Sequence, residues 1–157
     1  MPTLDSPLKN KISLLSPHHI LQMLELLIQD IDSTIEIDEY DFSRSGPTHT
    51  VDTIQHIQQK YPESSISMIV GADQLMNFQQ WKEYNKIIAS IHIIGFNREN
   101  SDFTPIPGMN ITWTEDFNVN ISSTKIREKI ENGKHIGNEL TPPVYNYIQE
   151  NNLYGCQ

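Results

Sequence analysis

The sequence has one cysteine, few basic residues and no long apolar run, and each shortage excludes a class of protein. The cysteine is Cys156, so the chain can form no internal disulfide, no cysteine-based zinc site and no Cys-x-x-Cys redox motif. Eleven Lys and Arg residues against 20 Asp and Glu residues provide no general basic field for a nucleic acid. No stretch approaches the ~20 apolar residues of a membrane span. We therefore expect a soluble, cytoplasmic protein that binds neither nucleic acid nor membrane.

The length of the chain and the spacing of its histidines narrow this expectation. With 157 residues the chain has the usual size of one domain. Its six histidines show no HExxH-like spacing, and no paired carboxylates, Ser-His-Asp or Cys-His arrangement stands above chance. We predict a single domain over residues 1–157, without a metal site built from protein side chains.

Apolar periodicity and capping residues predict alternating helices and strands. Helices are expected over residues 17–29, 50–61, a stretch containing 81–88, 122–133 and 142–148. Strands are expected over 34–37, 65–70, 91–96 and 111–114, with a loop over 42–47. Because strands and helices alternate, we predict an α/β fold with a parallel sheet covered by helices on both faces.

A group of polar residues opens the predicted helix over 122–133. Ser122, Ser123 and Thr124 supply hydroxyls and free backbone N–H groups, and Arg127 lies one turn further on. A helix N-terminus with a nearby guanidinium can bind an anion such as a phosphate. The alternative is that serine and threonine are here because they cap helices.

A second group follows the predicted strand over 65–70. Gly71-Ala72-Asp73 follows directly on this strand, where an open α/β sheet binds ligands, and the Asp73 carboxylate could accept hydrogen bonds from ribose hydroxyls. It could instead be a helix-capping residue. Trp81 could stack on a flat heterocycle, or could pack in the core beside the apolar residues that follow it.

Taken together and in order, these segments resemble bacterial nicotinate-mononucleotide adenylyltransferases. The matching motifs are Gly46-Pro-Thr-His-Thr-Val-Asp-Thr53, Gly71-Ala-Asp-Gln-Leu through Phe78 and Trp81, Ile121-Ser-Ser-Thr-Lys-Ile-Arg127, and Pro142-Pro-Val-x-x-Tyr-Ile148 with Leu153-Tyr154. The resemblance covers essentially the whole chain. It implies a Rossmann-like nucleotidyltransferase fold and a role in NAD biosynthesis, in which ATP and nicotinate mononucleotide give nicotinate adenine dinucleotide and pyrophosphate.

The resemblance also implies a role for individual residues. The ATP-phosphate site would be formed by Ser122, Ser123, Thr124 and Arg127, with Arg98 as a further candidate on the ATP side. Asp73 would contact ribose and Trp81 would stack on the nicotinate ring. Backbone N–H groups near Thr50 and Lys82 would meet the nicotinate carboxylate, and Mg²⁺ would be held largely by the phosphates of ATP.

One family motif is absent. Members of this family begin with a strand, a glycine-rich loop ending in His-x-Gly-His and a helix, whereas no His-x-Gly-His occurs in this sequence. The segment from Met1 to Lys9 instead resembles the stretch that comes after the family's second strand. We therefore expect a fold that is incomplete at its N-terminus, poorly stable alone, and inactive without the segment that carries the catalytic histidines.

Other functions remain open from the sequence. The acceptor could be nicotinamide mononucleotide or pantetheine phosphate, against which the Trp81 and Thr50 region argues. The chain could also be a non-catalytic nucleotide-binding module, which the missing His-x-Gly-His favours, or a flavodoxin-like domain whose motif matches are accidental. The sequence does not indicate an oligomeric state.

Overall fold

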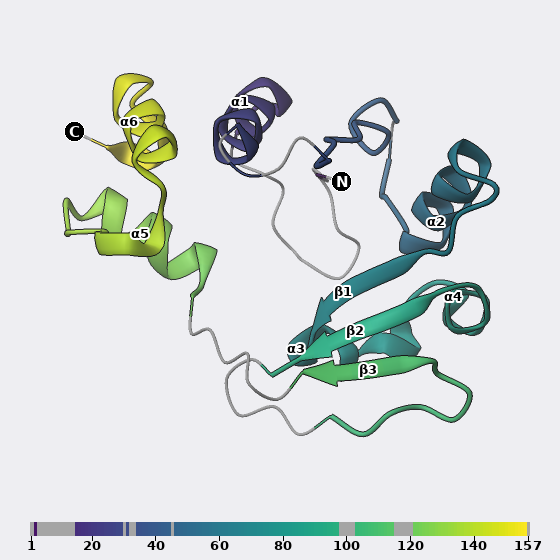
Figure 1. Cartoon of the computed structure of the whole chain (residues 1–157). Helices are drawn as coiled ribbons and strands as arrows, with labels where there is room; N and C mark the ends of the chain where they lie inside the picture. The colour runs from purple at the N-terminus through teal and green to yellow at the C-terminus, as the bar shows by residue number, and fades with distance from the viewer. Residues whose placement is uncertain are drawn as a thin grey trace. The chain divides into compact units, whose positions relative to one another are not determined.

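The computed structural model describes residues 2, 15–29, 31, 34–44, 46–97, 103–114 and 121–156. Its contacts divide the chain into two compact units, each with an apolar cluster of its own. The first unit combines residues 1–47 with 121–157, and the second comprises residues 48–120 (Figure 1). That the whole chain forms a single domain stays a prediction.

The second unit is built on a three-stranded parallel sheet (Figure 1). Its strands are β1 (Ser67–Gly71), β2 (His92–Phe96) and β3 (Ile111–Thr114), in the order β1-β2-β3. Both pairings are parallel. The predicted strands over 65–70, 91–96 and 111–114 are therefore confirmed, as is the α/β class with a parallel sheet.

Helices of the second unit pack on this sheet around one apolar cluster. They are α2 (Thr50–Lys60), the short α3 (Ala72–Leu75) and α4 (Tyr84–Ser90), with a 3-10 turn η1 (Phe78–Gln80). The cluster's buried residues are Val51, Ile54, Val70, Leu75, Phe78, Ile87, Ile91 and Ile93. Every helix and two strands contribute to it, so this cluster determines how the second unit packs.

Gly95 on β2 leaves room for the large aromatic ring of Trp113 on the neighbouring strand β3. A Cβ atom at Gly95 would lie 2.6 Å from Cε3 of Trp113, its register partner on β3. The Trp113 ring in turn stacks on Phe103, with 5.7 Å between ring centroids. A side chain at position 95 would displace this ring, which is the physical reason for glycine inside the strand.

The opposite face of the sheet carries a hydrogen-bonded row across all three strands. His92 Nδ1 lies 3.2 Å from Ser67 Oγ, and His92 Nε2 lies 2.9 Å from Thr112 Oγ1. Next to this row on β1, Ile69 is 72% exposed. Packing within the second unit therefore buries the Val70 and Ile93 face of the sheet and leaves much of the Ser67 and Ile69 face accessible.

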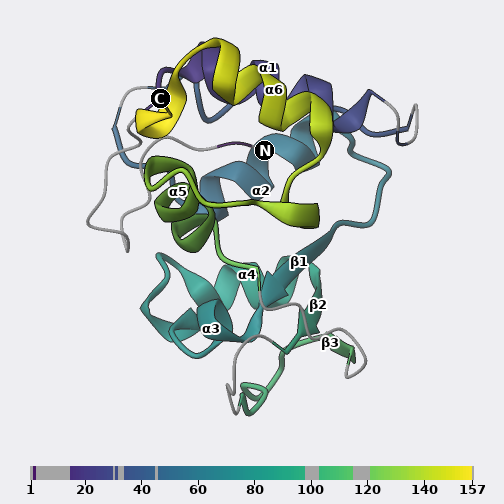
Figure 2. The same ribbon diagram turned by 90° about the vertical axis from the view of Figure 1, so that its left-hand side faces the viewer.

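The described secondary-structure elements of the first unit are all helical. It contains α1 (Pro17–Ile28), α5 (Ser123–Glu131) and α6 (Pro142–Glu150), with 3-10 turns η2 (Gly137–Glu139) and η3 (Leu153–Gly155). Helices α1 and α6 lie side by side (Figure 2). His19 Nδ1 lies 2.9 Å from the Tyr147 hydroxyl across this contact. The buried residues of its apolar cluster are Ile126, Ile130, Ile136, Val144, Ile148 and Leu153.

Two predictions of secondary structure need correction. Residues 34–37 form no strand, because a four-residue β-prone run pairs only where a neighbouring strand and a packing surface exist. Trp81 lies outside α4, which begins only at Tyr84, because Glu83 adopts a left-handed conformation (φ 52°, ψ 39°) that no α-helix can contain. The predicted helices over 17–29, 50–61, 122–133 and 142–148 are confirmed within a few residues at their ends.

Among the described residues, no helix is long and apolar enough to cross a membrane.

Candidate functional site

The start of α5 presents the polar side chains that the sequence singled out in the first unit. Ser122 is the extended N-cap residue, and its side chain makes no capping hydrogen bond within the described part of the chain. Ser123 and Thr124 are exposed on the first turn. Arg127 Nη2 donates a hydrogen bond to Thr124 Oγ1 at 3.4 Å, so the guanidinium and the hydroxyl share one end of the helix. Hydroxyls and a guanidinium at one helix start can bind an anion, and that they do so here stays a prediction.

Tyr154, in η3, lies close enough to Arg127 for its phenol to be influenced by the guanidinium charge. Its backbone is left-handed (φ 58°), and its half-buried ring packs with the apolar cluster of the first unit. Burial raises the pKa of the Tyr154 phenol, and the positive charge of Arg127 lowers it in part. The charge of Arg127 therefore acts on Tyr154 in η3 as well as on groups at the start of α5.

Titration should reveal this environment of Tyr154. Because its folded-state pKa lies above the ordinary value of 10.0, the folded protein keeps the phenol proton at a pH where the unfolded chain loses it. Its contribution to stability is present below about pH 10 and is lost as the pH rises through the folded-state pKa. Ultraviolet titration of the six tyrosines should show a late-ionising component that Tyr154→Phe removes. If Tyr154→Phe instead removed a tyrosine component that ionises with an ordinary pKa, the expectation would be contradicted.

In the second unit, Asp73 follows the carboxyl end of β1. It lies in the first turn of α3, behind the N-cap residue Gly71, so Asp73 is not itself the capping residue. Its Oδ2 accepts a hydrogen bond from Gln74 Nε2 at 3.2 Å. The carboxyl end of a parallel strand is where α/β sheets bind ligands, and a carboxylate there can accept hydrogen bonds from hydroxyls.

Trp81 is partly buried against the core of the second unit. Its ring lies 4.8 Å from the ring of Phe78, centroid to centroid, tilted by 34°. The indole Nε1 atom is buried and has no hydrogen-bond acceptor among the described residues. Trp81 therefore packs against the core as one of its two alternatives expects, and stacking on a heterocycle stays a prediction.

An ion pair ties the segment after Trp81 to the first turn of α2. Lys82 Nζ lies 3.5 Å from Oδ2 of Asp52, two residues after Thr50, with which α2 begins. The structure thus brings together the two segments from which the sequence predicted backbone contacts to a carboxylate. Sequence reasoning does not identify Asp52, because 30 residues separate it from Lys82 and no periodic pattern connects them.

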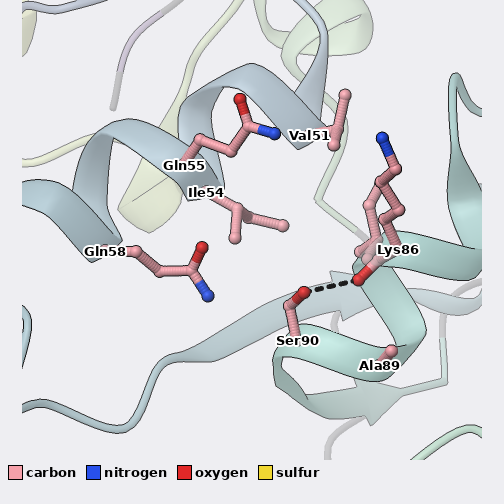
Figure 3. Close-up of a pocket in the computed structure, with 8 residues that line it drawn as sticks. Val51, Ile54, Gln55, Gln58, Lys86, Ala89 and Ser90 are labelled. Atoms are coloured by element: carbon pink, nitrogen blue, oxygen red, sulfur yellow. Dashed lines mark hydrogen bonds between the residues drawn. The ribbon is translucent and has the colours of Figure 1, made fainter.

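A shallow cavity of about 190 Å³ opens between α2 and α4 (Figure 3). Its lining residues are Val51, Ile54, Gln55, Gln58, Lys86, Ile87, Ala89 and Ser90. Ser90 Oγ donates a hydrogen bond to the Lys86 carbonyl at its rim. Ligand pockets typically measure about 300–1,000 Å³, and none of the predicted site residues lines this cavity. We therefore do not assign a ligand to it.

Two further predictions concern ATP and its metal. Arg98 lies outside the described residues. Within the described ranges, no three or more His, Cys, Asp or Glu residues gather in a way that could hold a metal ion. That Mg²⁺ enters with the phosphates of ATP stays a prediction.

Sequence comparison shows the family to which these features belong. The sequence profile of the cytidylyltransferase-like family matches residues 2–129. A probable nicotinate-nucleotide adenylyltransferase of Prosthecochloris aestuarii is 32% identical over 162 residues, which cover 96% of this chain and 79% of the relative. One from Flavobacterium johnsoniae is 34% identical and covers 95% of this chain and 78% of the relative.

Solved structures of the same kind share the fold. Nicotinic acid mononucleotide adenylyltransferase of Plasmodium falciparum complexed with NaAD superposes with a TM-score of 0.76 at 21% identity, covering 95% of this chain and 79% of the other. The same enzyme complexed with APC gives a TM-score of 0.74. The predicted Rossmann-like nucleotidyltransferase fold is confirmed.

Proposed function

We propose that this chain, which belongs to the cytidylyltransferase-like family and within it to the nicotinate-nucleotide adenylyltransferases, binds nicotinate mononucleotide in its second unit and ATP phosphates in its first. The observation that carries the proposal is that Lys82, the residue after Trp81, is ion-paired with the first turn of α2 in a chain about a third identical to these enzymes. As a nucleotidyltransferase of this family, the protein serves adenylyl transfer in NAD biosynthesis.

The second unit provides what a pyridine mononucleotide needs. Trp81 offers an aromatic face that packing on Phe78 keeps in place, and the nicotinate ring would stack on it. Asp73 would accept hydrogen bonds from ribose hydroxyls at the end of β1. The nicotinate carboxylate would meet backbone N–H groups at Thr50 and Lys82, and the positive end of α2 would favour its charge.

The first unit provides groups for the phosphates of ATP. Hydroxyls of Ser122, Ser123 and Thr124 and the guanidinium of Arg127 surround one helix start, where backbone dipoles favour negative charge. The phosphates would enter with Mg²⁺ as part of the substrate, since phosphate oxygens hold this ion largely without a protein cage. We assign Arg98 to the ATP side as well.

In the reaction, an oxygen of the mononucleotide's 5′-phosphate attacks the α-phosphorus of ATP, and the bond from that phosphorus to the pyrophosphate oxygen breaks. Such a transfer needs two anions held in line and the charge that develops on the leaving pyrophosphate stabilised. The residues at the start of α5 would stabilise that charge. We propose that turnover by these 157 residues is weak, because no His-x-Gly-His occurs in their sequence.

A non-catalytic nucleotide-binding role remains the second candidate, and the absence of His-x-Gly-His is the observation that favours it.

We also propose that the protein acts in the cytoplasm, where thiols stay reduced. The single, unpaired cysteine of the chain, Cys156, fits this location.

Calorimetric titration of the chain with nicotinate mononucleotide, nicotinamide mononucleotide and Mg²⁺-ATP tests this function. We expect the acid to bind at least about tenfold more tightly than the amide, because backbone donors at a helix start favour a carboxylate. Pyrophosphate release from ATP and the acid mononucleotide, measured in parallel, should stay near background. A folded protein that binds neither mononucleotide would contradict the proposal, and rapid turnover would contradict the expected inactivity.

A further inference from the structure

We propose that Tyr154 is a positioning residue for Arg127, whose guanidinium its ring keeps at the start of α5 and away from Glu131. The inference rests on the proposed function, in which Arg127 meets the phosphates of ATP at that helix start. It gives the C-terminal turn η3 a role in nucleotide binding.

Arg127 has two neighbours of different chemistry along α5. Thr124 lies three residues before it and Glu131 four residues after it, and side chains at these spacings meet on the surface of a helix. A pair with Glu131 would neutralise the guanidinium. In the structure, Arg127 Nη2 instead donates a hydrogen bond to Thr124 Oγ1 at 3.4 Å. Within the described part of the chain, no carboxylate forms an ion pair with Arg127, so its charge stays available to an anion.

The turn η3 packs against α5 on the side that carries Arg127 and Glu131. A Cβ atom at Gly155 would lie 3.6 Å from Cγ of Glu131, so the backbone of the turn reaches that residue. Tyr154 precedes Gly155, and its phenol is close enough to Arg127 to be influenced by the guanidinium charge. Consecutive residues of the turn therefore meet two residues that are one helical turn apart on α5. From this place the Tyr154 ring hinders the guanidinium from turning towards Glu131.

The backbone of the turn holds Tyr154 in this place. Tyr154 has a φ of 58° and Asn152 a φ of 50°, and such left-handed conformations of non-glycine residues persist where the surrounding structure constrains them. The ring of Tyr154 is half-buried and packs with the apolar cluster of the first unit. Because burial raises the pKa of the phenol, Tyr154 stays neutral at physiological pH and does not compete with a phosphate for the guanidinium.

A double-mutant cycle on Tyr154 and Glu131 tests the inference by calorimetric titration with Mg²⁺-ATP. Tyr154→Ala should weaken binding about fivefold, because the guanidinium must then be ordered on binding and Glu131 competes for it. Glu131→Gln should increase affinity about twofold more in the Tyr154→Ala protein than in the unchanged chain, since only there does the competition exist. The general effect of removing a negative charge appears in both backgrounds and cancels.

Tyr145→Ala is the matched control. Tyr145 packs on the same apolar cluster from α6, so its truncation removes an aromatic ring of the same kind. Tyr145→Ala, and Tyr154→Phe, which keeps the ring, should each leave the affinity for Mg²⁺-ATP within about twofold of that of the unchanged chain. Urea unfolding first shows that each variant is folded. Should Tyr154→Ala not fold, Tyr154→Leu takes its place, because leucine retains apolar contact with the cluster.

A ligand-free measurement examines the guanidinium directly. Arg127 is one of three arginines, so its Nε–H signal in a nitrogen-correlated NMR spectrum can be assigned from the loss of one signal in Arg127→Lys. Glu131→Gln should shift this signal in the Tyr154→Ala protein, where the carboxylate is within reach. The same substitution should leave the signal unmoved in the unchanged chain.

Four results would overturn the inference. They are unchanged affinity for Mg²⁺-ATP in folded Tyr154→Ala, equal losses for Mg²⁺-ATP and nicotinate mononucleotide in that variant, a loss as large in Tyr145→Ala, and a Glu131→Gln effect that is the same in both backgrounds. If the unchanged chain bound no Mg²⁺-ATP, the proposed ATP site would fail, and the NMR comparison would then decide by itself whether Tyr154 separates Arg127 from Glu131.

Discussion

Replacing Trp81 by alanine is expected to weaken nicotinate mononucleotide binding by about tenfold to a hundredfold. Stacking of a heterocycle on an aromatic side chain contributes about 1–3 kcal/mol, and no other ring of the described site would replace it. The ring is well placed for this role because Phe78 supports it, with 4.8 Å between the ring centroids. Calorimetric titration gives the loss directly.

Two controls separate stacking from packing. Trp81→Phe keeps a flat ring and should cost less than about fivefold in affinity. Because Trp81 also packs on the core, each variant is first shown by denaturant unfolding to be folded under the conditions of the titration. Unchanged affinity in folded Trp81→Ala protein would exclude the ring from the site, whatever the result for other residues.

The largest effect on stability is expected for Phe78→Ala. Phe78 is fully buried, and it belongs to the cluster that joins all helices of the second unit to the sheet. Removing a buried phenylalanine side chain loses its transfer free energy and leaves a cavity, which together cost about 3–5 kcal/mol. Domains have a free energy of unfolding of only about 5–15 kcal/mol, so this variant should lose much of its native population.

Met76→Ala is the matched control for Phe78→Ala. Met76 lies two residues away and is 60% exposed, so its truncation should change the free energy of unfolding by less than about 0.5 kcal/mol. Urea unfolding followed by tryptophan fluorescence measures both variants. A loss below about 1 kcal/mol for Phe78→Ala would mean that this cluster does not stabilise the chain as its burial suggests.

Several elements could be predicted from the sequence because their signals are local. Ser16 and Pro17 mark the start of α1, Pro142 marks that of α6, and the apolar run from Ile111 to Thr114 coincides with β3. Capping, proline geometry and strand composition depend on residues adjacent in sequence, so these signals can be recognised without knowledge of the fold. The false strand over 34–37 shows the limit, because a strand also requires a partner.

The candidate site also has features that the sequence predicts and features that only the structure shows. The order of the motifs in the sequence identifies the family that the comparisons show. Roles for Ser122, Asp73 and Trp81 stay predictions from the same motifs. The conformation of Glu83 could not be predicted, since a glutamate with positive φ is uncommon and only its surroundings impose it.

By itself, then, the sequence determined most of the elements, the parallel sheet and the family, and it predicts which residues form the site. Only the tertiary structure placed Lys82 against Asp52 across 30 residues, Gly95 against Trp113, and the ring of Trp81 4.8 Å from that of Phe78. The physical reason is that these contacts depend on how separate elements pack, and packing is decided by the shape and burial of the whole cluster rather than by any local pattern.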